Sequence, residues 1–325
     1  MSGVDSPVII LGAARSGTTL LADYLLAKHP ALVYVAEPAY LWRYGNAYRP
    51  HDVLLARDAR PEVRAAIRRR FASYLDGAPG RRLMEKTPAN CLRMPFVMEV
   101  FPDAQIVHVL RDGRDVALSA AREWVGRGRP RMPPGQSPPK GAARIGKILK
   151  AHAQLRQRVF DLRSFVELPA YAGRLFGVVW RQALHSSRFP WGPRFPGLRQ
   201  IRRRFSLLET CALQWEWSVR AARSACRGLP ERQYLEIRYE DLVRQPRQEI
   251  ETVLEMLGLD RSASIVDPMV AVVDTTEKPK WTGRPRAEFE GVENLVGTTL
   301  EELGYELPTR PARDAGRERA RGSGA

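Results

Sequence analysis

The sequence has 325 residues, 44% of them hydrophobic and 27% charged, with a formal net charge of +16, as in a soluble globular protein of one or two domains. No apolar run approaches the ~20 residues of a membrane-spanning helix, and the three scattered cysteines suggest neither a disulfide framework nor a metal site. The first residues also lack a signal-peptide pattern, so we expect a cytoplasmic protein.

Short apolar runs alternate with helical patterns along the first 125 residues. Residues 8–11 predict a buried strand, and leucines at helical spacing predict a helix over 17–28. Further strands are predicted at 33–35, over 81–87 and at 105–110, with helices over 57–74 and 113–124. Later in the chain, residues 233–238 predict another strand, followed by one helix that reaches residue 257.

Strands that alternate with helices imply a mostly parallel sheet covered on both faces. We therefore predict an α/β protein with a P-loop-like, three-layer α/β/α fold. Ligands of such sheets bind beyond the carboxyl ends of the strands. The loop at 12–19 and the turn at 111–115 both follow strands and precede helices, so both should face the same crevice.

Residues 126–204 interrupt this alternation and hold 18 Lys or Arg against two acidic residues, whereas the rest of the chain is balanced. We interpret 126–205 as a mainly helical basic insertion or lid, and 7–125 with 206–306 as the core of one domain spanning 1–306. The tail at 307–325 is predicted to be disordered.

The basic insertion admits three readings: binding of an anionic acceptor, peripheral contact with an anionic membrane through 126–205, or a solvated surface. Charge alone would also fit nucleic acid. No nucleic acid partner is expected, because no recognition motif accompanies the charge.

The loop at 12–19 places Gly12 and Gly17 at the spacing of a Walker A motif, but Thr18 stands where a nucleotide triphosphatase has its lysine. Backbone N–H groups at a helix N-terminus bind phosphate, and glycines let the backbone approach closely. Arg15 and the neighbouring hydroxyl groups add donors. The loop is therefore predicted to bind an anion, and the alternative is a tight turn without a ligand.

The stretch VLRDGRDVALS places Arg111 at a strand end and Ser119 two turns into the next helix. Arg111 can bind a second phosphate, and Ser119 can donate a hydrogen bond to it. The alternative is a salt-bridged turn, in which the two arginines of RDGRD pair with its two aspartates. Two anion-binding turns in one crevice indicate a nucleotide that is phosphorylated at two positions.

On these motifs the sequence resembles the sulfotransferases that use 3′-phosphoadenosine 5′-phosphosulfate (PAPS), of bacterial type and similar to the tyrosylprotein and glycan branch. ARSGTTLL resembles their 5′-phosphosulfate loop, and VLRDGRDVALS resembles their 3′-phosphate motif. YLEIRYEDLVRQP and KPKWTGRPRAEFEGVENLVGTTLEELGYE are similar to their later strand and closing loop. The resemblance covers residues 7–125 and 206–306, and it explains the missing lysine, because PAPS has no γ-phosphate.

The resemblance implies an enzyme that moves a sulfuryl group from PAPS, its co-substrate, to a hydroxyl acceptor or, less readily, an amine. The loop at 15–19 should hold the phosphosulfate, a second set of residues should hold the 3′-phosphate, and Tyr239 should lie beside the adenine. The expected cofactor-binding residues are Arg15, Ser16, Gly17, Thr18, Thr19, Arg111, Ser119, Arg122, Tyr239, Lys280 and Arg284.

Sulfuryl transfer needs a base for the acceptor and a positive charge at the leaving oxygen. Glu37 follows the second predicted strand, where the related branch carries a catalytic glutamate, so it is the expected general base. Lys86 follows the third strand and resembles the family lysine near the bridging oxygen, and Arg15 is the third expected catalytic residue. No metal is expected, because no Cys, His or carboxylate cluster has metal-ligand spacing.

Other side chains compete for these roles. Glu37 could instead be a surface carboxylate paired with an arginine, and Glu85 is a rival carboxylate that could orient Lys86. His29 and His108 are weaker candidates for the base, because His108 alternates within a strand and His29 stands at a helix end.

Two rival functions remain open from the sequence. One is a deviant P-loop kinase or triphosphatase. The other is a basic protein that binds nucleic acid or membrane and keeps an inactive nucleotide site. For a sulfotransferase, the acceptor stays open among carbohydrate, lipid, peptide tyrosine and small natural product.

Overall fold

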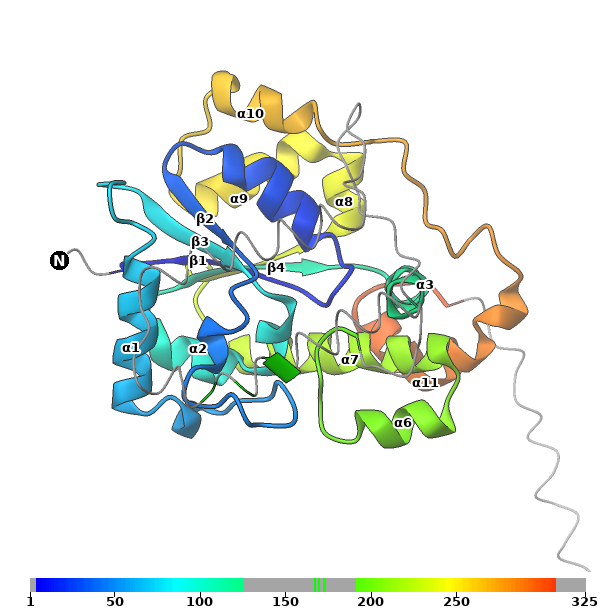
Figure 1. Cartoon of the computed structure of the whole chain (residues 1–325). Helices are drawn as coiled ribbons and strands as arrows, with labels where there is room; N and C mark the ends of the chain where they lie inside the picture. Colours follow the sequence, from blue (N-terminus) through cyan, green and yellow to red (C-terminus); the bar gives the residue numbers. More distant parts are fainter. Residues whose placement is uncertain (1–3, 126–166, 168, 170–171, 174–190, 308–325) are drawn as a thin grey trace, which may run out of the picture.

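The computed structural model describes residues 4–125, 167, 169, 172–173 and 191–307. A parallel sheet of five strands, in the order β2-β3-β1-β4-β5, forms its centre (Figure 1). The strands are β1 (Val8–Leu11), β2 (Leu32–Ala36), β3 (Arg82–Lys86), β4 (Gln105–Leu110) and β5 (Tyr234–Arg238). The predicted α/β fold with a central parallel sheet is confirmed.

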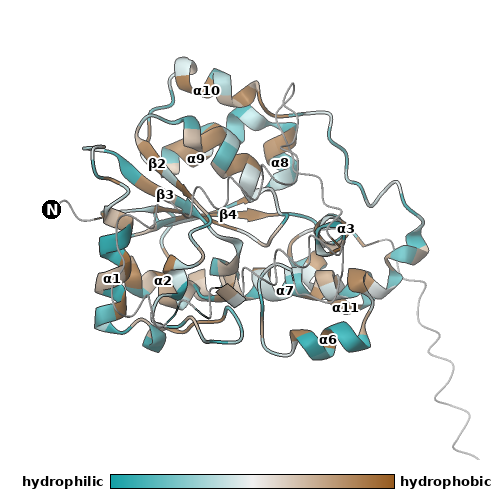
Figure 2. Ribbon diagram, viewed as in Figure 1, coloured by the Kyte–Doolittle hydropathy of each residue, from teal (hydrophilic) through white to brown (hydrophobic). Residues whose placement is uncertain are grey.

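Side chains of β1 alternate between two apolar cores, one on each face of the sheet. Ile9 and Leu11 pack with helices on one face, whereas Val8 and Ile10 pack with helices on the other. A strand buried on both faces is expected to be mostly apolar, and all four residues of β1 are apolar and buried. Figure 2 shows the hydrophobic colour of the neighbouring strand β4. The covering helices are α1 (Pro61–Ala72) and α2 (Met94–Val100) on one side, and α8 (Tyr239–Arg244), α9 (Pro246–Met256) and α10 (Ala263–Val270) on the other.

A third apolar core lies at the end of the sheet where β4 runs into α3 (Figure 1). It joins α3 (Gly113–Trp124), α7 (Leu207–Cys226) and α11 (Glu290–Glu302). The ring of Trp215 lies so close to Gly113 that an added Cβ would approach it to 2.6 Å. Trp215 Nε1 also donates to the carbonyl oxygen of Arg111 (3.1 Å). Packing of α7 therefore fixes the turn that follows β4.

Two helix boundaries differ from the sequence prediction, and both lie at a proline. The helix expected over 57–74 begins at Pro61, because proline suits the first helical position, where no N–H partner is needed. The single helix expected after β5 is two, α8 and α9, which meet at Gln245. Proline disfavours the helical conformation in the residue before it, and Gln245 has φ −132° and ψ 60°.

The helix that follows β1 covers the predicted range, but its winding is irregular. Residues Leu20–Leu25 form a π-helix, and Leu26–Lys28 form a 3₁₀ turn. Such departures from α-helical winding are frequent at functional sites.

Most of the predicted insertion, and the tail predicted to be disordered, lie outside the described residues. The end of the insertion includes α6 (Leu198–Arg204). Asp52 ties this end to the segment after β2, since its backbone N–H donates to the carbonyl oxygen of Arg194 (2.7 Å) and its carboxylate accepts from Arg194 N (2.8 Å). Within the described ranges, no helix has both the length and the apolar character needed to cross a membrane.

Candidate functional site

The loop between β1 and its helix turns sharply at two glycines. Gly12 and Gly17 have φ of 156° and 98°. A Cβ on Gly12 would lie 2.8 Å from the carbonyl oxygen of Val109, and a Cβ on Gly17 would lie 2.2 Å from the ring of Tyr239. Both positions therefore require glycine, for conformation and for space.

Polar groups of this loop lie against α3. Arg15, whose φ is 78°, donates from Nε to Ser119 Oγ (2.9 Å), and its guanidinium lies 3.4 Å from Glu123 Oε1. Ser16 is fully buried, and its hydroxyl group has no hydrogen-bond partner among the described residues. A buried hydroxyl without a partner is costly and indicates a missing ligand or a functional role. The loop after β1 is therefore in direct contact with the helix that carries Ser119.

The turn after β4 places Arg111 beside Tyr239, whose ring also packs against Gly17 of the loop after β1. Arg111 donates from a terminal nitrogen to Asp115 Oδ2 (3.0 Å), and its guanidinium lies 4.0 Å from the centre of the Tyr239 ring. The same terminal nitrogen lies 3.6 Å from Glu277 Oε1. Arg111 Nε is buried and has no hydrogen-bond partner within the described part of the chain. The salt-bridged turn that the sequence suggested is therefore present, and it forms part of the crevice.

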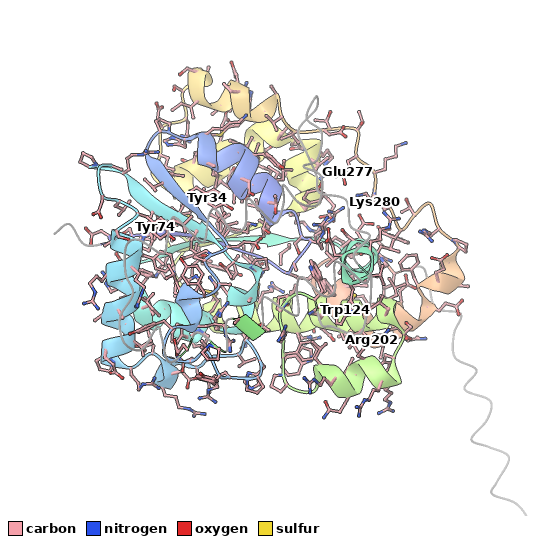
Figure 3. All side chains as sticks on the ribbon, in the orientation of Figure 1. Tyr34, Tyr74, Trp124, Arg202, Glu277 and Lys280 are labelled. Atoms are coloured by element: carbon pink, nitrogen blue, oxygen red, sulfur yellow. The ribbon has the colours of Figure 1, made fainter. Side chains whose placement is uncertain are left out.

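The segment between α10 and α11 closes over this turn. Asp115 Oδ1 accepts hydrogen bonds from the backbone N–H groups of Lys280 (2.8 Å) and Trp281 (3.0 Å). Tyr239 donates its hydroxyl to Glu277 Oε2 (2.6 Å), and Lys280 Nζ lies 3.4 Å from Glu277 Oε1. Figure 3 labels Glu277 and Lys280 beside the start of α3. We call this group the Arg111 cluster; its members are Arg111, Asp115, Tyr239, Glu277 and Lys280.

Two other predicted residues of this site lie apart from the cluster. Arg284 pairs with Glu288 (3.3 Å) within the closing segment. Arg122 is exposed on α3, away from the contacts described above. Glu277, by contrast, is central to the cluster and was not among the residues predicted from the sequence.

A second group of charges lies at the carboxyl ends of β2 and β3. Lys86 Nζ donates to Glu37 Oε1 (2.6 Å) and to Thr19 Oγ1 (3.3 Å), and it lies 3.8 Å from Asp23 Oδ1. Its side chain is 3% exposed, whereas that of Glu37 is 57% exposed. Because Thr19 belongs to the loop after β1, these charges lie beside that same loop. We call this group the Lys86 cluster; its members are Thr19, Asp23, Glu37 and Lys86.

Backbone pairing and charge hold the Lys86 cluster together. Glu37, with a φ of 46°, directly follows β2, and its N–H donates to the carbonyl oxygen of Lys86 (3.1 Å). Burial alone would lower the pKa of Lys86, but the carboxylates of Glu37 and Asp23 outweigh burial, and the pKa is raised. Burial raises the pKa of Asp23, which accepts a hydrogen bond from the Tyr34 hydroxyl. Lys86 is therefore held in its charged form between two carboxylates.

The rival bases lie in other surroundings. Glu85 points away from Lys86 into the core, where it accepts hydrogen bonds from Thr87 (2.9 Å) and Asn90, and burial raises its pKa to about 7. His108 is buried against the Tyr234 hydroxyl (2.8 Å), and burial lowers its pKa. His29 Nε2 lies 3.2 Å from the carbonyl oxygen of Asp260. The contacts of Glu85 and His108 are therefore with the core and the sheet, and that of His29 is with the segment between α9 and α10.

No group of three or more His, Cys, Asp or Glu side chains arranged to hold a metal ion occurs in the part of the chain that the structure describes. The donors that line the crevice are arginine, lysine, hydroxyl groups and backbone N–H groups. This set suits phosphate and sulfate oxygens.

A model described as Sulfotransferase family matches residues 7–164 and 187–263 of this chain. The nodulation protein NoeE of Sinorhizobium fredii is 25% identical over 342 residues, which cover 94% of this chain and 68% of that protein.

Two solved structures share the fold. A sulfotransferase domain from the curacin biosynthetic pathway gives a TM-score of 0.55 at 15% identity, covering 94% of this chain and 100% of that one. The sulfotransferase STF9 from Mycobacterium avium gives a TM-score of 0.50 at 13% identity, covering 95% of this chain and 79% of that one.

Proposed function

This chain belongs to the sulfotransferase family, and from that membership we propose that it transfers the sulfuryl group of PAPS to a hydroxyl acceptor and releases adenosine 3′,5′-bisphosphate (PAP). The observation that carries this proposal is the hydrogen bond between Arg15 Nε and Ser119 Oγ (2.9 Å). It joins the loop after β1 to the helix after β4, and this supports assigning both segments to a nucleotide with phosphate groups on its 5′ and 3′ oxygens. Transfer to an amine is the less favoured form of the same proposal.

We assign the 5′-phosphosulfate to the loop of residues 15–19. The glycine-lined backbone permits close approach, and the buried hydroxyl group of Ser16 gains the partner that it lacks within the described chain. We assign the 3′-phosphate to Arg111 and Ser119, because Arg111 Nε is also buried without a partner. Tyr239 packs against both Gly17 and Arg111, so its ring is suited to lie beside the adenine.

The Lys86 cluster is the proposed site of transfer. When bound, PAPS supplies a sulfuryl group whose bond to the 5′-phosphate oxygen breaks as the acceptor oxygen bonds to sulfur. Glu37, the more exposed carboxylate, accepts the proton of the acceptor hydroxyl. Lys86 and Arg15 stabilise the negative charge that develops on the leaving oxygen.

Asp23 extends this assignment beyond the residues predicted from the sequence. When Glu37 takes up the proton of the acceptor, it loses the negative charge that pairs with Lys86 Nζ. Asp23, 3.8 Å from Lys86 Nζ, remains as a counter-charge. Asp23 is therefore a positioning residue that keeps Lys86 protonated while Glu37 acts as a base.

We also propose that residues 1–306 act as one domain, with the end of the 126–205 insertion on the acceptor side. The hydrogen bonds between Asp52 and Arg194 support this, because Asp52 lies on the segment that leads away from Glu37.

The proposed activity is tested by incubating the purified chain with PAPS carrying ³⁵S and a panel of carbohydrate, lipid and phenolic hydroxyl acceptors. We expect labelled acceptor and an equal amount of PAP. If the chain instead turns over ATP with Mg²⁺ and does not use PAPS, the loop of residues 12–19 is that of a kinase or triphosphatase.

A further inference from the structure

The carboxylate of Glu277 lies where an anion bound by Arg111 would lie. Its Oε1 is 3.6 Å from an Arg111 nitrogen and 3.4 Å from Lys280 Nζ, and its Oε2 accepts the Tyr239 hydroxyl at 2.6 Å. The side chain is 13% exposed. Two cations and a hydroxyl donor around one oxyanion are also the groups that bind a phosphate. Glu277 thus has the surroundings of a bound anion.

The closing segment is anchored by contacts other than those of Glu277. Asp115 accepts the backbone N–H groups of Lys280 and Trp281. The guanidinium of Arg114 lies 3.7 Å from the centre of the Trp281 ring. Glu277 precedes these anchors by three or four residues, so the contacts that hold the segment do not depend on the Glu277 carboxylate.

The charges of the Arg111 cluster balance without a ligand. Arg111 and Lys280 carry two positive charges, and Asp115 and Glu277 carry two negative charges. The nearby Arg114 is already matched by Asp112 (2.8 Å) and Glu293 (3.0 Å). A phosphate dianion bound to Arg111 would therefore lie beside two carboxylates. Negative charges that are partly buried and close together repel strongly.

Of the two carboxylates, Glu277 is the one that can move. Asp115 is 3% exposed and holds the closing segment through two backbone hydrogen bonds. Glu277 is more exposed and contacts Arg111 at 3.6 Å, which is longer than a hydrogen bond.

We propose that Glu277 is an internal counter-anion at the 3′-phosphate site, that the 3′-phosphate of the nucleotide displaces it, and that it thereby sets selectivity for a doubly phosphorylated nucleotide. This inference rests on the proposed function. A 3′-phosphate carries up to two negative charges and replaces the carboxylate at Arg111 and Lys280. A nucleotide with a free 3′-hydroxyl leaves Glu277 in place.

The test is calorimetric titration of the full chain and its Glu277→Gln variant with PAP and with adenosine 5′-phosphate (AMP). Removing the carboxylate charge removes a competitor of the 3′-phosphate, so we expect the variant to bind PAP about tenfold more tightly than the wild type. Affinity for AMP should change by less than about twofold. Glu301→Gln makes the same chemical change at an exposed site on α11 and should alter neither affinity.

Weaker or unchanged PAP binding in Glu277→Gln would overturn the inference, and so would a loss of AMP affinity, which would mean that Glu277 binds the ribose hydroxyl. If Glu277→Gln does not fold, as judged by its melting temperature, Glu277→Ala carries the same expectation. The wild type tests the proposed function separately. If it prefers PAP to AMP but the variant gains nothing, the inference alone fails; if the wild type has no preference, the assignment of the 3′-phosphate site fails first.

Discussion

Lys86 ends β3 and Arg111 follows β4, the two strands that flank β1, and the charges of these two residues are balanced in different ways. Arg111 is enclosed by its carboxylates: its side chain is 8% exposed, and those of Asp115 and Glu277 are 3% and 13% exposed, whereas Lys280 of the same cluster is 49% exposed. In the Lys86 cluster, a lysine that is 3% exposed meets Glu37, which is 57% exposed. Enclosure suits a site that binds a constant group of the nucleotide, whereas an open carboxylate suits contact with an acceptor.

The largest effect on activity is expected at Glu37, the exposed carboxylate of the Lys86 cluster. Glu37→Gln removes the proposed base but keeps a polar side chain of the same size, so turnover of PAPS should fall by about 100-fold to 10,000-fold. Affinity for PAP should stay within about threefold of the wild type. Steady-state kinetics and calorimetry measure the two quantities. Unchanged turnover would remove Glu37 as the base and leave it a surface partner of Lys86.

The second prediction concerns Glu85, the buried neighbour of Lys86 in the sequence, and its effect on the stability of the fold. Its pKa of about 7 lies above that of an unfolded glutamate, so its protonated form stabilises the fold at low pH. That stability is complete below the unfolded pKa and is lost as the pH rises through about 7, with an upper limit of roughly 3 kcal/mol.

The free energy of unfolding, measured by urea denaturation, should fall between pH 5 and pH 8.5 in the wild type. In Glu85→Gln it should fall less over the same range. Glu301→Gln, which changes an exposed carboxylate, should follow the wild type. An identical pH dependence in Glu85→Gln and the wild type would show that Glu85 is ionised throughout this range.

A substitution at Arg111 should weaken binding of the nucleotide more than it slows turnover. Arg111→Ala removes a charged hydrogen-bond donor, so PAP affinity should fall by about 2 kcal/mol or more. Affinity for AMP should fall less, because AMP lacks the 3′-phosphate. Arg122→Ala, which removes an exposed arginine of the neighbouring helix, should cost less than Arg111→Ala. Equal losses for PAP and AMP in Arg111→Ala would place the 3′-phosphate elsewhere.

A smaller effect is expected at Asp23. Asp23→Asn keeps a hydrogen-bond acceptor for Tyr34 but removes a negative charge 3.8 Å from Lys86 Nζ, so the pKa of Lys86 should fall. The alkaline limb of the pH–rate profile should move to lower pH, and kcat should fall by about tenfold, equal to about 1.4 kcal/mol. KM for PAPS should change little. A drop in kcat with no shift of the alkaline limb would assign Asp23 a purely structural role.

The parts of the crevice that follow from local sequence could be predicted. A glycine loop follows one apolar run and an arginine follows another, and parallel pairing brings these two strand ends together. Lys86 and Glu37 were found in the same way, and they are in contact. The split between α8 and α9 was also readable, because Pro246 stands inside the expected helix.

Contacts between distant segments could not be predicted. Asp23 stands on the helix after β1 among leucines and alanines, and its role depends on β3 bringing Lys86 beside it. Glu277 precedes Lys280 in a segment with no regular pattern, and only the folded chain brings it to Arg111. The order of the strands in the sheet likewise depends on packing between distant segments. Hydrophobic periodicity and turn residues, which report on local structure, do not predict it.

The central claim is that the crevice binds a nucleotide through two phosphate groups at different positions. The most direct measurement is the affinity of the wild-type chain for PAP and for AMP, which differ only in the 3′-phosphate, by calorimetry in one buffer at fixed salt. We predict that PAP binds at least about 30-fold more tightly, the equivalent of about 2 kcal/mol for the charged hydrogen bonds of the 3′-phosphate. Equal affinities would contradict the claim and leave the turn at Arg111 a structural salt bridge.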